Sequence, residues 1–346
     1  MSITREFDFL IQWHLTERCN LRCSHCYQSG LHGEELSFGE LKNALDEISQ
    51  TLTIWADNYE IAFVPSMNIT GGEPFLFENL FETLEYVRLK GFEMYILSNG
   101  TLATREKAEQ LRELGVKGVQ VSIEGPETVH ERIRGKGTFA SSLRGVNHFL
   151  NAGLEVTLNM TLSALNAESF PDIKDLASSL GVQRLGFSRL VPSGRGKDML
   201  NYMLTKDKVK DLYSVISSMR ENGLEIVTGD PVASQSFFAF HPEDDDSTPM
   251  GGCAAGVSGM TIMPDGTLLP CRRMPIPLGN IRKDSFREIW ATSPVLLKLR
   301  DKSSYAGKCG KCRRWVSCRG CRAIAYAYSQ SRGKADFLAD DPQCFL

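Results

Sequence analysis

The chain reads Leu15-Thr16-Glu17-Arg18-Cys19-Asn20-Leu21-Arg22-Cys23-Ser24-His25-Cys26-Tyr27 directly after an apolar stretch that predicts a strand from Phe9 to Leu15. Cys19, Cys23 and Cys26 lie within eight residues, so we expect them to share one metal centre. A cubane of four irons has four ligand positions, and three cysteines leave one iron open for an exogenous donor. The spacing therefore predicts an iron-sulfur cluster with a reactive iron.

Two other uses of these thiols are a zinc site and a disulfide with a spare thiol. A closed structural zinc takes four protein ligands in a tetrahedral array. His25 is a candidate for the fourth ligand, but it lies between Cys23 and Cys26, where the short loop would strain to turn all four groups onto one ion. Ten cysteines in a chain without an export signal favour metal ligation over disulfides, because cytosolic thiols are kept reduced.

The Cys-x3-Cys-x2-Cys motif after a first apolar strand resembles the signature of the radical S-adenosylmethionine (AdoMet) enzymes. The resemblance implies that the amino and carboxylate groups of AdoMet chelate the open iron. It also implies that one electron from the cluster cleaves the sulfonium to a 5'-deoxyadenosyl radical, which abstracts hydrogen from unactivated carbon. Cys19, Cys23 and Cys26 are then the catalytic residues, and a low-potential flavodoxin or ferredoxin is the expected reductant.

Composition indicates a soluble globular protein. The 346 residues are 42% hydrophobic with a formal net charge of -3, enough for a sizeable core and two domains. No apolar run is long enough to span a bilayer, and the N-terminus lacks the layout of a signal peptide, so we expect no membrane contact and a cytoplasmic location. The near-neutral charge gives no basic footprint for nucleic acid.

Apolar runs alternate with amphipathic stretches, which is typical of parallel strands joined by crossover helices. Strands are predicted at Phe9–Leu15, Met67–Thr70, Phe92–Leu97, Gly118–Ile123, Leu154–Leu162 and Arg184–Leu190. Helices are predicted at Ser37–Trp55, Leu80–Lys90, Arg105–Leu114, Phe139–Ala152, Phe170–Leu180 and Lys206–Glu221, with Ser37 and Glu40 forming a capping box. These units predict an α/β fold, a partial (β/α)6 TIM-like barrel over residues 1–225. A linker over residues 226–250 and a small cysteine-rich domain over residues 251–346 follow.

Ligands of parallel sheets gather beyond the carboxyl ends of the strands, so the loops there are candidates for AdoMet binding. The resemblance assigns the AdoMet amino group to the Gly71-Gly72-Glu73-Pro74 loop, adenine to His25 and the AdoMet carboxylate to Arg134. A solvated surface charge is the alternative for Arg134. Short polar groups after the next strands are predicted to hold the ribose and the methionyl end. The cofactor-binding set is His25, Gly71, Gly72, Glu73, Ser98, Asn99, Ser122, Glu124 and Arg134. Glu124 replaces the aspartate that is common in the family.

Seven further cysteines lie in the last hundred residues, at Cys253, Cys271, Cys309, Cys312, Cys318, Cys321 and Cys344. Four of them could form a zinc ribbon between positions 309 and 321, which would leave the other three unexplained. The pattern resembles the SPASM domain, which implies two auxiliary 4Fe-4S clusters beside the radical cluster. In relatives the thiols at positions 309, 312, 318 and 344 close one cluster. The thiols at positions 253, 271 and 321 then leave one iron of the second cluster open or held by another ligand.

The domain pair is associated with maturases of peptides and proteins. We therefore expect a peptide maturase that forms a thioether or carbon-carbon cross-link in a ribosomally synthesised peptide, with a separate leader-binding partner protein. Sulfatase maturation is disfavoured, because Arg272-Arg273 stand where that subgroup has an aspartate after the cysteine. The stretches Ser193-Gly194-Arg195-Gly196-Lys197 and Glu243-Asp244-Asp245-Asp246 either flank the substrate entrance or are solvated loops.

Two alternatives to the peptide maturase stay open. The first is oxidation of a tetrapyrrole side chain, since haem-pathway enzymes share the two domains and the region around Cys271. The second is a non-enzymatic iron-sulfur electron carrier or scaffold. The glycine-rich loop at Gly71 and Gly72 argues against the carrier, because an electron carrier needs no nucleoside site.

Overall fold

The structure, a computed structural model, describes residues 5–28, 33–219, 223–237 and 251–346. Its first part contains β1 (Arg5–Thr16), β2 (Ile61–Gly71), β3 (Glu93–Ser98), β4 (Gly118–Ser122), β5 (Glu155–Leu162), β6 (Arg184–Arg189) and β7 (Glu225–Val227). The helices between them are α1 (Phe38–Tyr59), α2 (Leu80–Leu89), α3 (Arg105–Glu113), α4 (Glu127–Arg134), α5 (Thr138–Asn151), α6 (Phe170–Leu180) and α7 (Lys206–Ser218). The short 3-10 helices η1 (Pro74–Leu76), η2 (Ala167–Ser169) and η3 (Gly194–Tyr202) lie in loops.

The later part of the chain begins with η4 (Pro231–Ala233) and α8 (Ser234–Phe237). It continues through β8 (Gly259–Ile262), β9 (Thr267–Leu269), β10 (Gly279–Asn280), α9 (Phe286–Thr292), α10 (Pro294–Arg300), η5 (Lys302–Ser304), α11 (Gly307–Gly310) and α12 (Arg322–Gln330). The acidic run at 243–246, predicted beside the substrate entrance, lies outside the described residues.

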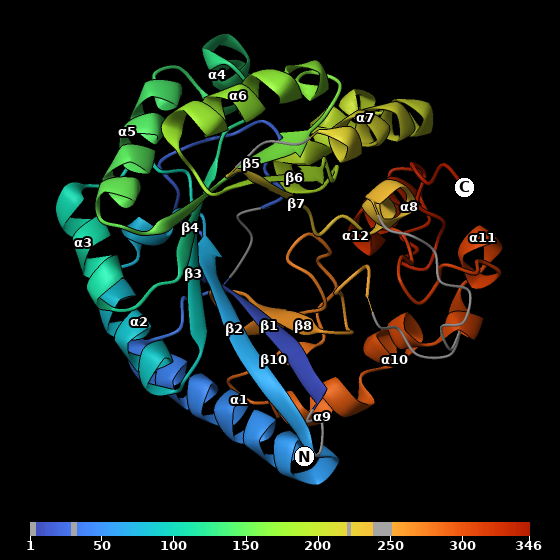
Figure 1. Ribbon diagram of the computed structural model, residues 1–346. Coiled ribbons are helices and arrows are strands. Elements are labelled where there is room, and N and C mark those ends of the chain that lie inside the picture. The colour runs from blue at the N-terminus through green and yellow to red at the C-terminus, as the bar shows by residue number, and fades with distance from the viewer. Residues whose placement is uncertain (1–4, 29–32, 220–222, 238–250) are drawn as a thin grey trace.

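The described strands form one curved sheet in the order β10-β9-β8-β1-β2-β3-β4-β5-β6-β7. All neighbours from β8 to β7 are parallel, and β8-β9-β10 are joined by antiparallel pairing. Helices α1, α2, α3, α5 and α6 cover the outer face of this sheet, and the C-terminal elements lie across its open side (Figure 1). Helix α4 lies instead at the carboxyl ends of the strands, where its Ile133 carbonyl accepts a hydrogen bond from Ser24 of the loop after β1. The predicted partial α/β barrel is therefore confirmed.

The six predicted strands and the six predicted helices all appear, with bounds that differ by up to six residues, and helix α4 was not predicted. Two parallel strands were not predicted. β7 is three residues long, too short to show a period, and β8 lies within the cysteine-rich stretch that we assigned to a separate domain. The sheet crosses this predicted boundary, and the boundaries at 225 and 250 stay a prediction.

Strand β1 runs through the centre of the sheet. Its odd positions Phe9, Ile11 and Trp13 are at most 1% exposed, and its even positions point to the opposite, inner face because successive side chains of a strand alternate. Gln12 and His14 thereby reach the inside of the barrel. The N-terminus of α1 carries the predicted capping box, in which Ser37 and Glu40 bond each other's backbone N–H groups.

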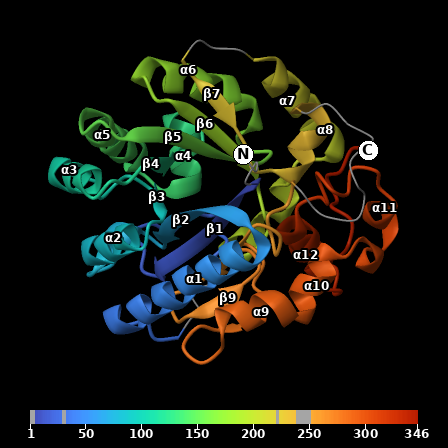
Figure 2. The same ribbon diagram turned by 60° about the horizontal axis from the view of Figure 1, so that its bottom comes forward.

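The C-terminal part shares the sheet and the core of the barrel. Leu10 is opposite Gly259 in the register of β1 and β8, and a Cβ on Gly259 would lie 2.2 Å from the Leu10 carbonyl oxygen. The Phe9 ring packs edge-on against Phe286 and Trp290 of α9, at centroid distances of 6.2 and 5.0 Å. Helix α9 lies next to α1 in both ribbon views (Figure 2). The two predicted domains are therefore packed as one body.

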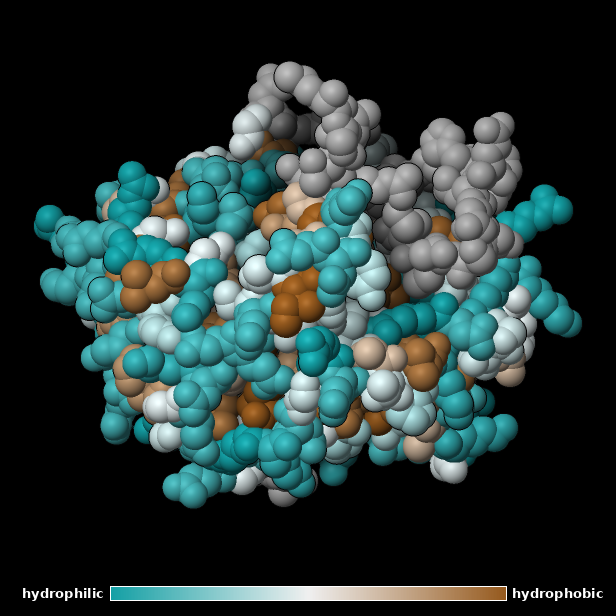
Figure 3. All heavy atoms as spheres, turned by 90° about the horizontal axis from the view of Figure 1, so that it is seen from below, coloured by the Kyte–Doolittle hydropathy of each residue, from teal (hydrophilic) through white to brown (hydrophobic). Residues whose placement is uncertain are grey.

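No helix in the described part of the chain is both long and apolar enough to cross a bilayer. On the face seen in Figure 3, hydrophobic residues are scattered among hydrophilic ones. Scattered apolar residues are usual on a protein surface and indicate no interaction site by themselves.

Candidate active site

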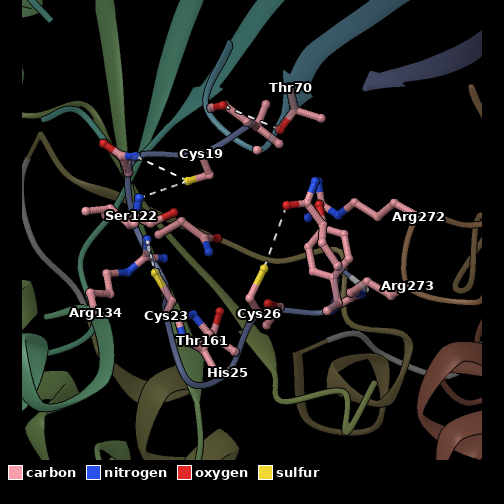
Figure 4. Close-up of a pocket in the computed structure, with 18 of the residues that line it drawn as sticks. Cys19, Cys23, His25, Cys26, Thr70, Ser122, Arg134, Thr161, Arg272 and Arg273 are labelled. Carbon is pink, nitrogen blue, oxygen red and sulfur yellow. Dashed lines mark hydrogen bonds between the residues drawn. The ribbon is translucent and has the colours of Figure 1, made fainter. Parts of the chain in front are cut away.

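A cavity opens at the carboxyl ends of the parallel strands, where the barrel fold predicts ligands. Cys19, Cys23 and Cys26 all line it, and Figure 4 shows their sulfur atoms around one hollow. The structure therefore brings together the three thiols that the sequence analysis assigned to one centre. Seven of the nine predicted cofactor-binding residues also line this cavity: His25, Gly71, Gly72, Ser98, Asn99, Ser122 and Arg134.

The loop that carries the three cysteines is held by backbone hydrogen bonds to distant elements. The Ser24 N–H donates to the Ile133 carbonyl of α4 over 2.9 Å, and the Gly196 N–H of η3 donates to the Cys26 carbonyl over 3.0 Å. The Asn99 side-chain amide reaches the Cys19 sulfur at 4.0 Å. The thiols are thus fixed by long-range contacts and not by the loop alone.

The two glycines after β2 are required by packing against this loop. A Cβ on Gly71, whose φ is +146°, would lie 2.3 Å from the Thr16 carbonyl oxygen. A Cβ on Gly72 would lie 2.1 Å from the Arg18 carbonyl oxygen. No side chain fits at such distances, so only glycine lets the two loops meet and form this wall of the cavity.

Glu73 was predicted to bind the cofactor, but it does not line the cavity. It is fully buried and accepts hydrogen bonds from the Ser98 hydroxyl at 2.8 Å and from the Asn99 N–H at 2.9 Å. Burial raises the pKa of Glu73 to about 7, against the opposing effect of these two donors. In this structure Glu73 positions two residues that do face the cavity.

Glu124 is also buried and does not line the cavity, but it contacts two residues that do. Its Oε1 accepts from Arg134 at 2.9 Å (Nε) and 2.6 Å (Nη2), and it lies 3.2 Å from His25 Nε2. Burial alone would raise the pKa of Glu124, but the Arg134 and His25 charges outweigh it and hold that pKa well below its ordinary value. The Arg134 side chain is only 10% exposed. The solvated-surface alternative for Arg134 is therefore wrong.

The sequence analysis missed several polar residues of the wall. They come from the loop after β1, the inner faces of the strands and the C-terminal part, and they are Tyr27, Gln28, Thr70, Gln120, Asn159, Thr161, Ser188, Arg189, Arg272 and Arg273. Arg195 also lines the cavity, and it belongs to the stretch that was predicted either to flank the substrate entrance or to be a solvated loop. Some of the missed residues could have been predicted from the pattern of polar residues in the strands. Gln120 and Ser122 in β4, and Asn159 and Thr161 in β5, are polar at every second position of otherwise apolar strands, as expected for side chains facing a wet interior.

Arg272 and Arg273 lie on the side of the cavity opposite Cys19 and Cys23, whereas Arg134 lies beside Cys23 (Figure 4). Arg189 is fully buried and paired with Asp230 and Asp341. Arg272 and Arg273 have no carboxylate partner among the described residues, and the buried Nε of Arg273 has no hydrogen-bond acceptor there. Neither guanidinium is therefore held in a direct ion pair with a carboxylate of this part of the chain, although Cys321, Cys271 and Asp230 are close enough to favour the charged form of Arg273.

Five of the seven C-terminal cysteines fall into two places. Cys253, Cys271 and Cys321 line a second cavity, which shares Arg272 and Arg273 with the first. On the other side of Cys321, the Gln235 side-chain amide reaches the sulfurs of Cys318 at 3.8 Å and of Cys344 at 3.4 Å. A zinc ribbon would need Cys318 and Cys321 on one ion, whereas here they lie with different partners.

All ten cysteines lie in the described part of the chain, and none forms a disulfide. Burial raises the pKa of Cys309 to about 11 and of Cys321 to about 12, so each would be a neutral thiol without a metal and would lose its proton on binding one. Within the described residues, no three His, Cys, Asp or Glu side chains converge on a single ion. An iron-sulfur cubane does not need such convergence, because each iron takes its own thiolate. The lack of a single-ion site is therefore compatible with iron-sulfur clusters at these thiols.

Known proteins resemble this chain over nearly its whole length. The Radical SAM superfamily model matches residues 13–177, and an iron-sulfur cluster-binding domain, SPASM, matches residues 253–321. The AdoMet-dependent heme synthase of Methanosarcina barkeri (strain Fusaro / DSM 804) is 31% identical over 353 residues, which cover 97% of this chain and 95% of that protein. Mycofactocin maturase MftC of Mycobacterium tuberculosis (strain CDC 1551 / Oshkosh) is 30% identical over 331 residues, 91% of this chain and 78% of that protein.

A solved structure with the same fold is that of Streptococcus suis SuiB bound to S-adenosylmethionine. Its TM-score is 0.74 at 17% sequence identity, and the alignment covers 98% of this chain and 78% of that chain. At this identity the likeness shows the fold alone.

Proposed function

Because the chain belongs to the radical SAM superfamily and carries a C-terminal SPASM domain, we propose that it oxidises a carboxylate-bearing side chain of a tetrapyrrole. The chain is a radical AdoMet enzyme, and its two domains imply iron-sulfur clusters and AdoMet as cofactors. When bound, these cofactors supply a 5'-deoxyadenosyl radical that abstracts a hydrogen atom from the substrate. The electron-carrier alternative loses its support, because the similar proteins are named as synthases and maturases.

The first cavity is the proposed place of this reaction. Cys19, Cys23 and Cys26 would hold the radical cluster and leave one iron to AdoMet. The AdoMet molecule would lie along the wall formed by the two glycines after β2 and by the polar ends of β3 to β6. Arg134 has its Nη1 within 3.8 Å of the Cys23 sulfur, so it can pair with an AdoMet carboxylate beside the open iron while Glu124 holds its other edge.

The C-terminal cysteines are proposed as ligands of two auxiliary clusters. Cys309, Cys312, Cys318 and Cys344 would hold one, and the second cavity would hold the other through Cys253, Cys271 and Cys321. Such a cluster supplies an electron acceptor, which side-chain oxidation requires once a hydrogen atom has been removed. Its cavity adjoins the active site through Arg272 and Arg273.

The observation that carries the choice of substrate is the full-length relationship to AdoMet-dependent heme synthases. A cavity with unpaired arginines agrees with it, since tetrapyrroles carry several carboxylates. Peptide cross-linking, our first expectation, becomes the second candidate and is supported by the similarity to MftC. A leader-binding partner belongs to that candidate only. The reductant and the cytoplasmic location stay predictions.

The test uses anaerobically reconstituted enzyme with AdoMet and dithionite. Iron coproporphyrin, whose side chains are carboxyethyl groups, is added to one sample, and peptides encoded beside the gene are added to another. By mass spectrometry we expect 5'-deoxyadenosine and an oxidised porphyrin. The porphyrin should have lost two hydrogen atoms from a side chain, either alone or together with the carboxylate as carbon dioxide. A modified peptide with an unchanged porphyrin would overturn the proposal.

The ligand assignment has a separate test. Replacing Cys19, Cys23 and Cys26 together with alanine should leave about eight irons per chain on the auxiliary pair. Iron analysis and Mössbauer spectra of the reconstituted variant measure this content. About four irons per chain would instead indicate two clusters of two irons each, about two irons would indicate a single one, and either result would contradict the assignment.

A further inference from the structure

A third cavity lies at the mouth of the active site. It is lined by Tyr27, Gln28, Ser193, Gly194, Arg195, Lys197, Asp198, Met263, Leu269, Arg272, Pro275 and Gln330. Four of these residues, Tyr27, Gln28, Arg195 and Arg272, also line the active-site cavity. A molecule bound in the mouth therefore extends directly into the space beside the three N-terminal cysteines.

The wall contributed by η3 is fixed in place. Gly194 has a φ of +57°, and a Cβ there would lie 2.3 Å from the Tyr27 carbonyl oxygen. The Arg195 Nε donates to the Cys23 carbonyl at 3.2 Å. The stretch from Ser193 to Lys197 thus packs against the cysteine loop, and its two cations stand at the entrance.

The charge of the mouth is predominantly positive. Arg195, Lys197 and Arg272 face one acidic side chain, Asp198. Arg272 has neither an ion pair nor a hydrogen bond within the described ranges, and its guanidinium carbon lies 5.6 Å from the centre of the Tyr27 ring. Contact with an aromatic ring leaves the N–H groups at the edge of a guanidinium free, and these form the fork that matches a carboxylate.

The rest of the wall is mixed, with the polar side chains of Gln28, Ser193 and Gln330 beside an apolar part. Met263, Leu269 and Pro275 contribute hydrocarbon surface between the cations. A ligand that suits this combination has an apolar body and anionic groups on its rim. Binding a carboxylate to Arg272 would also neutralise a partly buried charge that otherwise lacks a partner.

We propose that the mouth is the substrate subsite and that Arg272 binds a carboxylate of the substrate, with Arg195 and Lys197 beside it. The inference rests on the proposed function, and for a tetrapyrrole the bound group is a carboxyethyl side chain on the ring edge. An acidic peptide is the competing ligand, and the test separates the two.

The test measures binding to the reconstituted enzyme in the presence of AdoMet by anaerobic equilibrium dialysis. The probes are deuteroporphyrin, a metal-free tetrapyrrole with two carboxyethyl groups, and its dimethyl ester. Arg272→Met should weaken binding of the dicarboxylate about ten- to hundredfold, the usual effect of one charge-assisted contact. It should leave the weaker binding of the diester unchanged. Arg272→Lys should recover part of the affinity.

Arg287→Met is the matched control, because Arg287 is an exposed arginine of α9 away from the three cavities. Iron content and visible spectra of each variant show whether the neighbouring Cys271 site is intact. AdoMet affinity is measured in parallel, since Arg272 also borders that cavity.

The outcomes separate the two proposals. If wild type and Arg272→Met bind the dicarboxylate with the same affinity, the assignment of Arg272 to the substrate subsite is overturned. The proposed function is unaffected by this result. A loss of AdoMet binding with unchanged porphyrin binding would assign Arg272 to the cofactor and also overturn the subsite assignment. If the wild type binds neither porphyrin but binds an acidic peptide in an Arg272-dependent way, the tetrapyrrole function itself fails.

Discussion

Glu124 connects two side chains and one backbone N–H group at one point of the active-site wall. Besides Arg134 and His25, it accepts the Thr161 N–H through Oε2 at 2.8 Å. A buried carboxylate with these partners is stabilised as an anion, and its removal leaves a nearly buried guanidinium without a counter-charge. The family resemblance suggested a cofactor contact here, whereas the geometry indicates a residue that fixes the contacts of others.

Glu124→Gln should lower the free energy of unfolding by about 3 kcal/mol, because Arg134 then stays buried and unpaired. Glu124→Asp keeps the charge and should recover part of the loss. Denaturant unfolding under anaerobic conditions measures both variants. The control is Glu127→Gln, at an exposed position of α4, where we expect less than about 1 kcal/mol. Equal stability of Glu124→Gln and the control would contradict this role.

The raised pKa of Glu73 predicts that the free energy of unfolding depends on pH. Its pKa is raised from the ordinary value of 4.5 to about 7, so between these values the folded chain binds more protons than the unfolded chain. The contribution of Glu73 to stability is therefore complete below about pH 4.5 and is lost as the pH rises towards 7. Glu73→Gln should remove this component, seen as a flatter dependence of the unfolding free energy on pH. Parallel profiles for wild type and variant would refute the assignment.

Among the elements, the loop that carries the cysteines depends on the loop after β2. Gly72 must be a glycine because the Arg18 carbonyl occupies the place of a Cβ. We expect Gly72→Ala to destabilise the fold by about 1–3 kcal/mol and to lower the iron content of the N-terminal site.

Gly39→Ala is the matched control for this substitution. Gly39 lies in the first turn of α1 with no atom within 4 Å of its would-be Cβ, so alanine should be neutral or slightly stabilising there. Thermal unfolding and iron analysis of both variants compare the two positions. Full iron loading and unchanged stability of Gly72→Ala would show that the two loops can separate.

The elements predicted well were those with local patterns. The strands, the helices and the capping box at Ser37 follow from periods and spacings within one segment. Glu73 was misplaced because its partners, Ser98 and Asn99, are distant in sequence, and Arg272 was noticed only as an argument against one activity. Which arginine lacks an acidic partner depends on the whole fold, and no local pattern reports it.

At the scale of the whole molecule, a buried ion-pair network joins the end of β6 to the C-terminus. Arg189 donates to Asp230 and Asp341 at 2.8 Å and to the Gln343 side chain at 2.9 Å. Asp341 in turn accepts the Cys321 N–H at 2.8 Å. The network therefore fixes the segment that carries Cys344 against the barrel.

Arg189→Met should destabilise the protein by about 3–5 kcal/mol, because two buried carboxylates lose their partner. Arg184 of the same strand is the matched control, since its side chain is 39% exposed and pairs with Glu155 and Glu225 at the surface. Arg184→Met should cost less than about 1 kcal/mol. Anaerobic denaturant titrations compare the two, and similar costs would contradict a structural role for the buried network.

The pairing of β1 with β8 bears on how such an enzyme can change over evolution. Without residues 251–346, the backbone of β1 from Leu10 to Trp13 would lose one of its two partner strands and keep only β2, and an uncovered strand edge invites association with other chains. Loss of the C-terminal iron-sulfur module would thus expose the centre of the barrel. We therefore expect descendants of this protein to alter or abandon its clusters one ligand at a time, while the polypeptide that surrounds them is inherited whole.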